Sequence, residues 1–122
     1  MFTRSHHIKR ERKKSLFFKT LSTLFVQKAQ EVKIFQHLFL TKVEFSKKSS
    51  STCTLFFYST QGEDHFNKAL KKLITLKGWF RSSISSIIQA RNTPELKFKF
   101  DTLYEKQKEL DTLLSSIAHE LH

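Results

Sequence analysis

Apolar side chains recur at helical spacing in the first part of the chain. This repeat predicts an amphipathic helix from Lys9 to Lys28. Its apolar face carries Leu16, Phe17, Leu21, Leu24 and Phe25. Basic residues such as Arg12 and Lys19 fall outside that face. The helix should therefore lie on a core with its charges in water.

A second periodicity follows, in which every other residue is apolar. Residues 39–45 alternate as a half-buried strand does. The side expected to face the core carries Phe39, Thr41, Val43 and Phe45. The polar residues 46–51 form a break of hairpin length, and the β-rich run Thr52–Tyr58 comes after it. The two strands should pair as an antiparallel hairpin.

Two helices are expected next. Thr60 and Glu63 have the spacing of a capping box, which predicts a helix start. The core stripe of this helix is Phe66, Ala69, Leu70 and Leu73. Continuing the same helix would turn Lys77 into that stripe, so we expect Gly78 to bend the chain. A third helix should begin at Trp79, end before Pro94 and bury Ile84, Ile87 and Ile88.

The last part of the chain predicts one more strand and one more helix. Leu96–Phe100 alternates strictly, burying leucine and phenylalanine and exposing two lysines. Thr102 and Glu105 repeat the capping-box spacing. The following amphipathic stripe is Leu110, Leu113, Leu114 and Ile117. The order of elements is α-β-β-α-α-β-α, which predicts an α+β fold with a three-stranded sheet packed against helices.

Length and composition bound what the chain can be. Its 122 residues suit one domain, 1–122, with the basic residues 1–8 expected to be flexible. No apolar run approaches the roughly 20 residues of a membrane helix. The single cysteine, Cys53, has no partner for a disulfide or a thiolate zinc site within one chain. A reducing cytoplasm fits this cysteine usage best.

The charge distribution favours a polyanionic partner. The formal net charge is +11, and residues 101–122 are acidic, so the positive charge belongs to the first hundred residues. An AT-rich genome that inflates lysine and phenylalanine is a partial alternative explanation, consistent with 13 Phe and 2 Gly. The carboxylates Glu95 and Asp101 are too far apart along a strand for a catalytic pair, and we expect structural roles for them. No catalytic constellation or cofactor motif is readable, and His6, His7 and Glu11 have no regular metal-ligand spacing.

Two motifs resemble a known family. Two helices meeting at a glycine within this order of elements resemble a type II KH-like domain. The run 77–81, Lys-Gly-Trp-Phe-Arg, and the run 94–101, Pro-Glu-Leu-Lys-Phe-Lys-Phe-Asp, resemble the paired motifs of ribosome-binding factor A. Support upstream comes from Val43-Glu44-Phe45-Ser46 and from the strand 55–59, and the resemblance covers roughly residues 9–117. One departure is Leu76, where the family usually has alanine.

The resemblance implies a role and a place in the cell. It implies a cytoplasmic, monomeric factor that binds the free, immature small (30S) ribosomal subunit and assists 16S rRNA maturation and processing. It implies no enzymatic activity, no cofactor, no small-molecule substrate and no membrane. Two other classes stay open: a structural ribosomal protein, and a module using the basic first helix on an anionic membrane surface or a protein partner.

The candidate RNA contacts are basic and small residues around the expected bend. On the second and third helices they are Lys68, Lys71, Lys72, Lys77, Gly78, Arg81, Ser82 and Ser85. Three more are expected outside these helices: Arg91, Arg10 and Lys13. An ordinary solvated lysine face is the alternative, but the chain has no acidic residue between Asp64 and Glu95. The serines could be simply small and exposed, and Trp79 could stack on a base or join the core.

Overall fold

A computed structural model describes residues 2–46, 51–89 and 92–120, with side chains from residue 9 onward. Its elements are α1 (Phe2–Glu31), a short 3-10 helix η1 (Lys33–His37), β1 (Leu38–Phe45), β2 (Thr52–Ser59), α2 (Glu63–Thr75), α3 (Lys77–Ile88), β3 (Glu95–Phe100) and α4 (Thr102–Glu120). This order confirms the predicted sequence of helices and strands. Two differences are η1, which was not predicted, and α1, which begins at Phe2 rather than Lys9.

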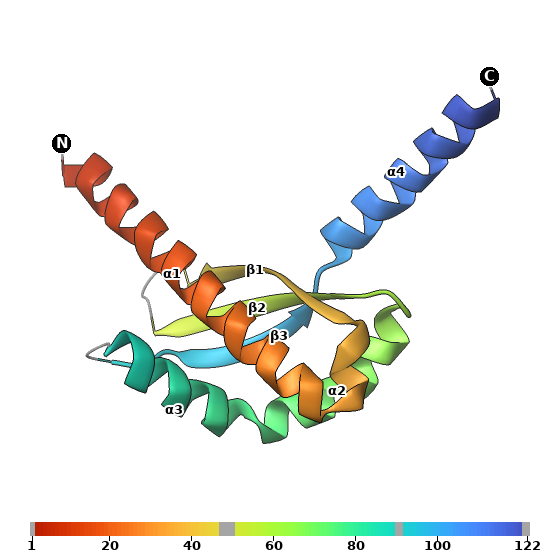
Figure 1. The fold of residues 1–122 in the computed structure, drawn as a ribbon. Helices are drawn as coiled ribbons and strands as arrows, with labels where there is room; N and C mark the ends of the chain where they lie inside the picture. The colour runs from red at the N-terminus through yellow and green to blue at the C-terminus, as the bar shows by residue number, and fades with distance from the viewer. Residues whose placement is uncertain (1, 47–50, 90–91, 121–122) are drawn as a thin grey trace.

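The three strands form one sheet in the order β1-β2-β3. β1 and β2 are antiparallel, as the hairpin spacing predicted. β2 and β3 are parallel, because α2 and α3 lie between them in the chain and return it to the same end of the sheet. Figure 1 shows α1, α2 and α3 on one side of this sheet. Among the described residues, no complete helix lies along the other side.

The core lies between the sheet and these three helices. Phe57, on the central strand, is at its middle: its ring centroid lies 5.1 Å from that of Phe25 on α1 and 6.2 Å from that of Phe98 on β3. The other large side chains that are almost fully buried include Phe17, Phe35, Phe80, Leu21, Leu73, Ile84 and Leu96. Aromatic rings thus fill much of the space that holds the helices on the sheet.

The expected alternation along β1 is wrong at its first half. The pairing with β2 is interrupted between Leu40 and Lys42, where Thr41 is an extra residue on β1. Such a bulge shifts which residues face the core by one position. Leu38 is therefore buried, whereas Phe39 is 53% exposed. Thr41 instead donates a hydrogen bond from Oγ1 to Oδ2 of Asp101, at 2.6 Å.

The expected capping box at the start of α2 is also wrong. The residue before α2 is Gly62, whose φ of 92° lies in the left-handed region that favours glycine, and no side chain caps the helix. Thr60 lies two residues too early, because the turn between β2 and α2 uses Gln61 and Gly62. In that turn the Gln61 amide donates to Oγ of Ser59, at 3.1 Å.

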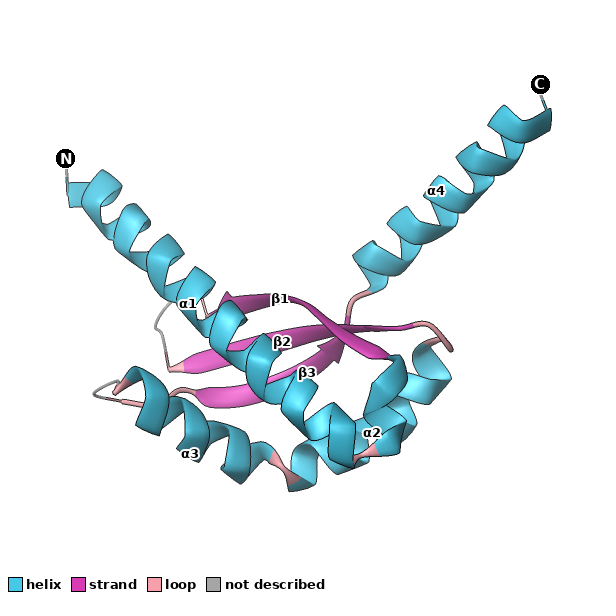
Figure 2. Cartoon of the chain, in the orientation of Figure 1, coloured by secondary structure: helices cyan, strands magenta, loops and turns pink. Residues whose placement is uncertain are grey.

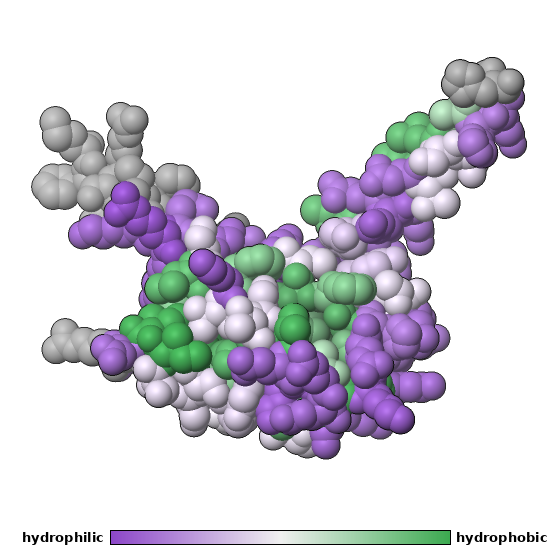
Figure 3. Space-filling view, viewed as in Figure 1, coloured by the Kyte–Doolittle hydropathy of each residue, from purple (hydrophilic) through white to green (hydrophobic). Residues whose placement is uncertain are grey.

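The last helix differs from the expectation in its packing. Its N-terminal cap is Asp101, whose Oδ1 accepts a hydrogen bond from the Tyr104 amide at 2.9 Å, rather than Thr102. α4 contains no buried residue and projects away from the body of the molecule (Figure 1). Its apolar stripe is at the surface, as the hydrophobic patches along α4 in Figure 3 show. The exposed members are Leu103, Leu110, Leu113, Leu114 and Ile117.

The buried cysteine gives a test of the core. Cys53 is 0% exposed, and burial raises the pKa of its thiol to about 12, more than the nearby Lys13 lowers it. The thiol should stay protonated and inaccessible in the folded protein. We expect alkylation by iodoacetamide near neutral pH to be slow in buffer and fast in denaturant. Rapid modification of the folded protein would contradict the placement of Cys53.

A histidine beside β2, His65, should make the free energy of unfolding depend on pH. Burial lowers the pKa of His65 below 6.5, and the neighbouring His37 and Lys68 lower it further, while a hydrogen bond to the Ile34 backbone acts in the opposite direction. The Nδ1 atom of His65 lies 2.7 Å from Oγ of Ser59. The His65 imidazole therefore binds a proton more readily in the unfolded chain than in the folded protein.

The free energy of unfolding should consequently fall as the pH is lowered from about 7.5 to about 5.5, through the unfolded pKa of this side chain. Urea titrations at the two pH values measure this change, and His65→Gln should make it smaller. An identical pH dependence in the wild type and in His65→Gln would exclude His65 as its source.

Candidate nucleic-acid interface

The junction between α2 and α3 is a single residue, Leu76. Its φ of −95° and ψ of 2° leave the helical region, and Figure 2 shows the short break there. Gly78 was expected to bend the chain, but it lies in the first turn of α3, where a Cβ would meet no atom within 4 Å. The bend is at Leu76 because this side chain packs against the core together with Trp79, whereas Gly78 is not part of that packing.

Three lysines on α2 form the strongest positive feature beside this junction. Lys68, Lys71 and Lys72 are exposed, on the side of α2 opposite its buried Phe66 and Leu73. None of the three makes an ion pair with any residue that the structure describes. We refer to Lys68, Lys71 and Lys72 as the α2 lysine face.

The two other predicted cations of this region have partners. Lys77 Nζ lies 3.2 Å from Oε1 of Glu95, and Arg81 Nη1 lies 3.8 Å from Oε2 of the same carboxylate. Arg81 also donates from Nε to the Pro94 carbonyl (3.1 Å) and from Nη2 to the Thr93 carbonyl (3.2 Å). These contacts hold the entry of β3 against α3. The charge of Lys77 and Arg81 is thus partly offset by Glu95.

The serines of α3 lie beside a shallow surface hollow. Arg81, Ser82, Ser85, Ser86 and Thr93 line it, and its volume is about 440 Å³. Small hydroxyl side chains allow the close approach of a phosphate backbone and offer hydrogen bonds to it. The hollow and the α2 lysine face lie on consecutive helices that meet at Leu76.

Of the three remaining RNA contacts expected from the sequence, the structure describes two. Arg10 and Lys13 are on α1 near the hairpin end of the sheet, where Arg10 Nη2 donates to the Ser46 carbonyl (2.7 Å) and Lys13 Nζ lies 5.0 Å from the Phe45 ring centroid. Along α1, Lys13 lies about 22 Å from Lys28, the α1 residue that contacts Trp79 at the start of α3, at 1.5 Å per residue. Arg91 lies outside the described residues.

The aromatic pair at the start of α3 belongs largely to the core. Phe80 is 1% exposed, and Trp79 is half-buried against it. Lys28 of α1 places its Nζ 4.2 Å from the Trp79 ring centroid, a cation–π contact that sequence reasoning missed because it joins distant segments. Ile84 is buried as expected, but Ile87 is 58% exposed. The inward line is Phe80, Ile84 and Ile88, and Ile87 lies about 60° from Ile84 around the helix.

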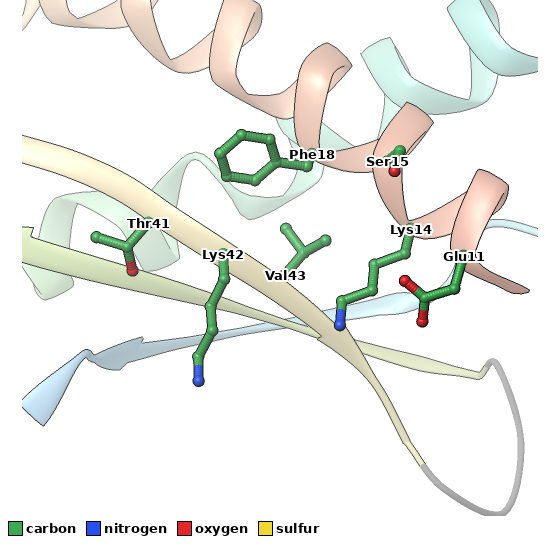
Figure 4. Close-up of a pocket in the computed structure, with 7 residues that line it drawn as sticks. All are labelled: Glu11, Lys14, Ser15, Phe18, Thr41, Lys42 and Val43. Atoms are coloured by element: carbon green, nitrogen blue, oxygen red, sulfur yellow. The ribbon is translucent and has the colours of Figure 1, made fainter. Parts of the chain in front are cut away.

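A second hollow, between α1 and β1, has different chemistry. It measures about 290 Å³ and is shown in Figure 4. Its lining combines Phe18 and Val43 with Glu11, Lys14 and Lys42. Lys14 Nζ is paired with Oε1 of Glu44 at 3.2 Å, so the positive charge here is partly neutralised. This hollow therefore does not extend the α2 lysine face.

Within the described ranges, no helix has the length and apolar character needed to cross a membrane. The same ranges contain no group of three or more histidine, cysteine or acidic side chains placed to hold a metal ion. The two candidate surface features of α2 and α3 are the α2 lysine face and the serine hollow.

Comparisons of the sequence with a family model and with known proteins point to the same family. The family model described as ribosome-binding factor A matches residues 9–114. The ribosome-binding factor A of Mycoplasmopsis pulmonis is 28% identical over 114 residues, covering 93% of this chain and 97% of that protein.

Two solved structures have the same fold. The crystal structure of ribosome-binding factor A from Thermus thermophilus is similar with a TM-score of 0.61 and 18% identity, covering 74% of this chain and 92% of that one. The solution structure of a ribosome binding factor A candidate from Thermotoga maritima has a TM-score of 0.57 and 19% identity, covering 70% and 84%. These likenesses confirm the KH-like α+β fold. The match over residues 9–114 establishes that this chain belongs to the ribosome-binding factor A family, whose members are ribosome-binding factors and not enzymes.

Proposed function

We propose that this protein is a ribosome biogenesis factor that binds the free, immature small (30S) ribosomal subunit and assists 16S rRNA maturation and processing. The observation that carries this proposal is the α2 lysine face, whose three ammonium groups have no ion-pair partner among the described residues. Family membership supports the ribosome as the partner. The whole chain acts as one KH-like domain, as a cytoplasmic monomer.

Electrostatic attraction supplies most of the binding on this surface. Lys68, Lys71 and Lys72 contact phosphates and release counterions from the rRNA. The serines of the α3 hollow let the backbone approach and accept or donate hydrogen bonds. Sequence-specific base contacts are not required, because the folded shape of the rRNA supplies selectivity. Arg81 contributes by holding the loop before β3 in place rather than as a free cation.

Fractionation of cell extracts on sucrose gradients tests this role. The protein should co-sediment with free small subunits and be absent from complete ribosomes. Accumulation of unprocessed 16S rRNA should follow its depletion. Equal amounts in free subunits and complete ribosomes would instead identify a structural ribosomal protein, and absence from every ribosomal fraction would overturn the proposal.

A further inference from the structure

The sheet has a second face that no helix of the described chain covers along its length. On β2, Cys53, Leu55, Phe57 and Ser59 are buried beneath the helices, and the alternate residues Thr52, Thr54, Phe56 and Tyr58 face the opposite way and are half-buried. Helix α4 reaches this side only at its beginning, where the ring centroids of Tyr104 and Tyr58 are 4.9 Å apart. The remainder of α4 points away from the sheet (Figure 1).

The strand register places two lysines on either side of an aromatic ring on this face. Phe56 pairs with Lys42 of β1 and with Lys99 of β3, so the three side chains form one row across the sheet. In Figure 4, Lys42 points away from α1 while the adjacent Val43 points toward it. Lys42 Nζ lies 4.7 Å from the Phe56 ring centroid. A long, flexible side chain therefore occupies the place that a nucleobase could take on this ring.

Neighbouring positions add further basic and aromatic side chains to this face. Lys97 pairs with Thr54 in the next row, and both Lys97 and Lys99 are exposed. Tyr58 lies two residues from Phe56 on the central strand, about 6.6 Å at 3.3 Å per residue. Its ring stacks on Phe100, with centroids 6.4 Å apart. We refer to Lys42, Phe56, Tyr58, Lys97 and Lys99 as the open-face platform.

Three acidic residues on or next to the strands are already engaged. Glu44 is paired with Lys14 of α1, and Glu95 is paired with Lys77 and Arg81 of α3. Asp101 accepts hydrogen bonds from the Tyr104 amide and the Thr41 hydroxyl. Lys97 and Lys99 make no ion pair with any residue in the described ranges. Their positive charge is therefore available to a ligand.

We propose that the open-face platform binds single-stranded RNA. Bases stack on Phe56 and Tyr58, and Lys42, Lys97 and Lys99 contact the phosphates. An acidic peptide would use the lysines but not the flat aromatic rings, whereas a single strand uses both. The platform lies on the side of the sheet away from α2, so it deepens the proposed function, on which it rests, by giving the protein a second rRNA contact. Its binding to RNA can be measured without a ribosome.

The test measures binding of a fluorescently labelled single-stranded RNA hexamer to the full chain by anisotropy at several salt concentrations. Lys97→Gln together with Lys99→Gln should weaken binding roughly tenfold and reduce the salt slope by about 1.4, because each phosphate contact to a single strand contributes about 0.7. The matched control is Lys19→Gln with Lys33→Gln, which removes the same charge from exposed positions on α1 and η1, outside the platform. The control should change the affinity by less than about twofold.

Phe56→Leu tests the stacking contribution. It keeps an apolar side chain at a half-buried position and should weaken binding roughly tenfold while leaving the salt slope unchanged. A urea titration checks that this variant folds. If it does not fold, the two surface lysine pairs still decide the question. Equal affinities of the Lys97/Lys99 variant and its charge-matched control, or unchanged binding by folded Phe56→Leu, would overturn the platform.

Failure of the platform is distinguishable from failure of the proposed function. Lys71→Gln with Lys72→Gln should weaken binding to free small subunits, and the loss of hexamer binding caused by Lys97→Gln with Lys99→Gln should persist in that background. A protein that binds the hexamer through the platform but no ribosomal subunit would retain this inference and lose the proposed function.

Discussion

Replacing Phe57 with alanine should lower the free energy of unfolding by about 3–5 kcal/mol, the usual loss for a fully buried phenylalanine. Phe57 is 1% exposed on the central strand and contacts the aromatic rings of Phe25, Phe66 and Phe98. Domains are typically stable by only about 5–15 kcal/mol, so this variant should be close to unfolded at physiological temperature. The midpoint of urea denaturation measures the effect.

Phe39→Ala is the matched control for this prediction. Phe39 is 53% exposed because of the bulge at Thr41, so its truncation should change the free energy of unfolding by less than about 0.5 kcal/mol. A loss as large as that of Phe57→Ala would mean that Phe39 faces the core. That result would contradict the bulged pairing of β1 with β2.

Reversing the charge of Lys71 and Lys72 to glutamate should weaken binding to free small ribosomal subunits by at least roughly tenfold. Each lysine removed takes away a phosphate contact, and each glutamate adds repulsion. Both side chains are exposed and make no ion pair in the described structure, so the fold should be unaffected. Co-sedimentation at several salt concentrations measures the change in affinity.

The control for this variant reverses Lys106 and Lys108 on α4, which produces the same change in net charge. These lysines are also exposed on a helix, but they lie on the projecting acidic end of the chain. Binding by the control should stay close to that of the wild type. If both variants lose the same affinity, the attraction is due to overall charge and not to the α2 lysine face.

Much of the fold could be predicted from periodicity, because burial on one side leaves a clear pattern. The residues Phe66, Ala69 and Leu73 of α2 repeat at helical spacing, and Leu96 and Phe98 of β3 repeat at strand spacing. All of these are buried. The parallel pairing of β3 with β2 was not predicted, because single-sequence patterns do not identify strand neighbours.

Other features depend on tertiary contacts that leave no local signal. The bulge at Thr41 inserts one residue into β1 without breaking the run of strand-forming residues. Leu76 replaces Gly78 as the bend because its side chain packs on the core. The sequence marks α4 as amphipathic, but the pattern alone does not tell a stripe that packs on the body from one that stays at the surface.

The candidate site was predicted in part. The α2 lysines are exposed together, as the acid-free stretch after Asp64 indicated. The pairing of Lys77 and Arg81 with Glu95 could not be predicted, since it requires knowing that β3 lies beside α3. The open-face platform was missed for the same reason. Lys42, Phe56 and Lys99 become neighbours only when three strands are aligned.

The proposed function requires the α2 lysine face to contact the rRNA of the small subunit. Site-specific photo-crosslinking tests it most directly, with a photoreactive amino acid at position 71 in one variant and at position 106 in another. In cells, position 71 should crosslink to 16S rRNA in free small subunits, and position 106 should give little or no such crosslink. Absence of rRNA crosslinks from position 71, or equal yields from both positions, would contradict the claim.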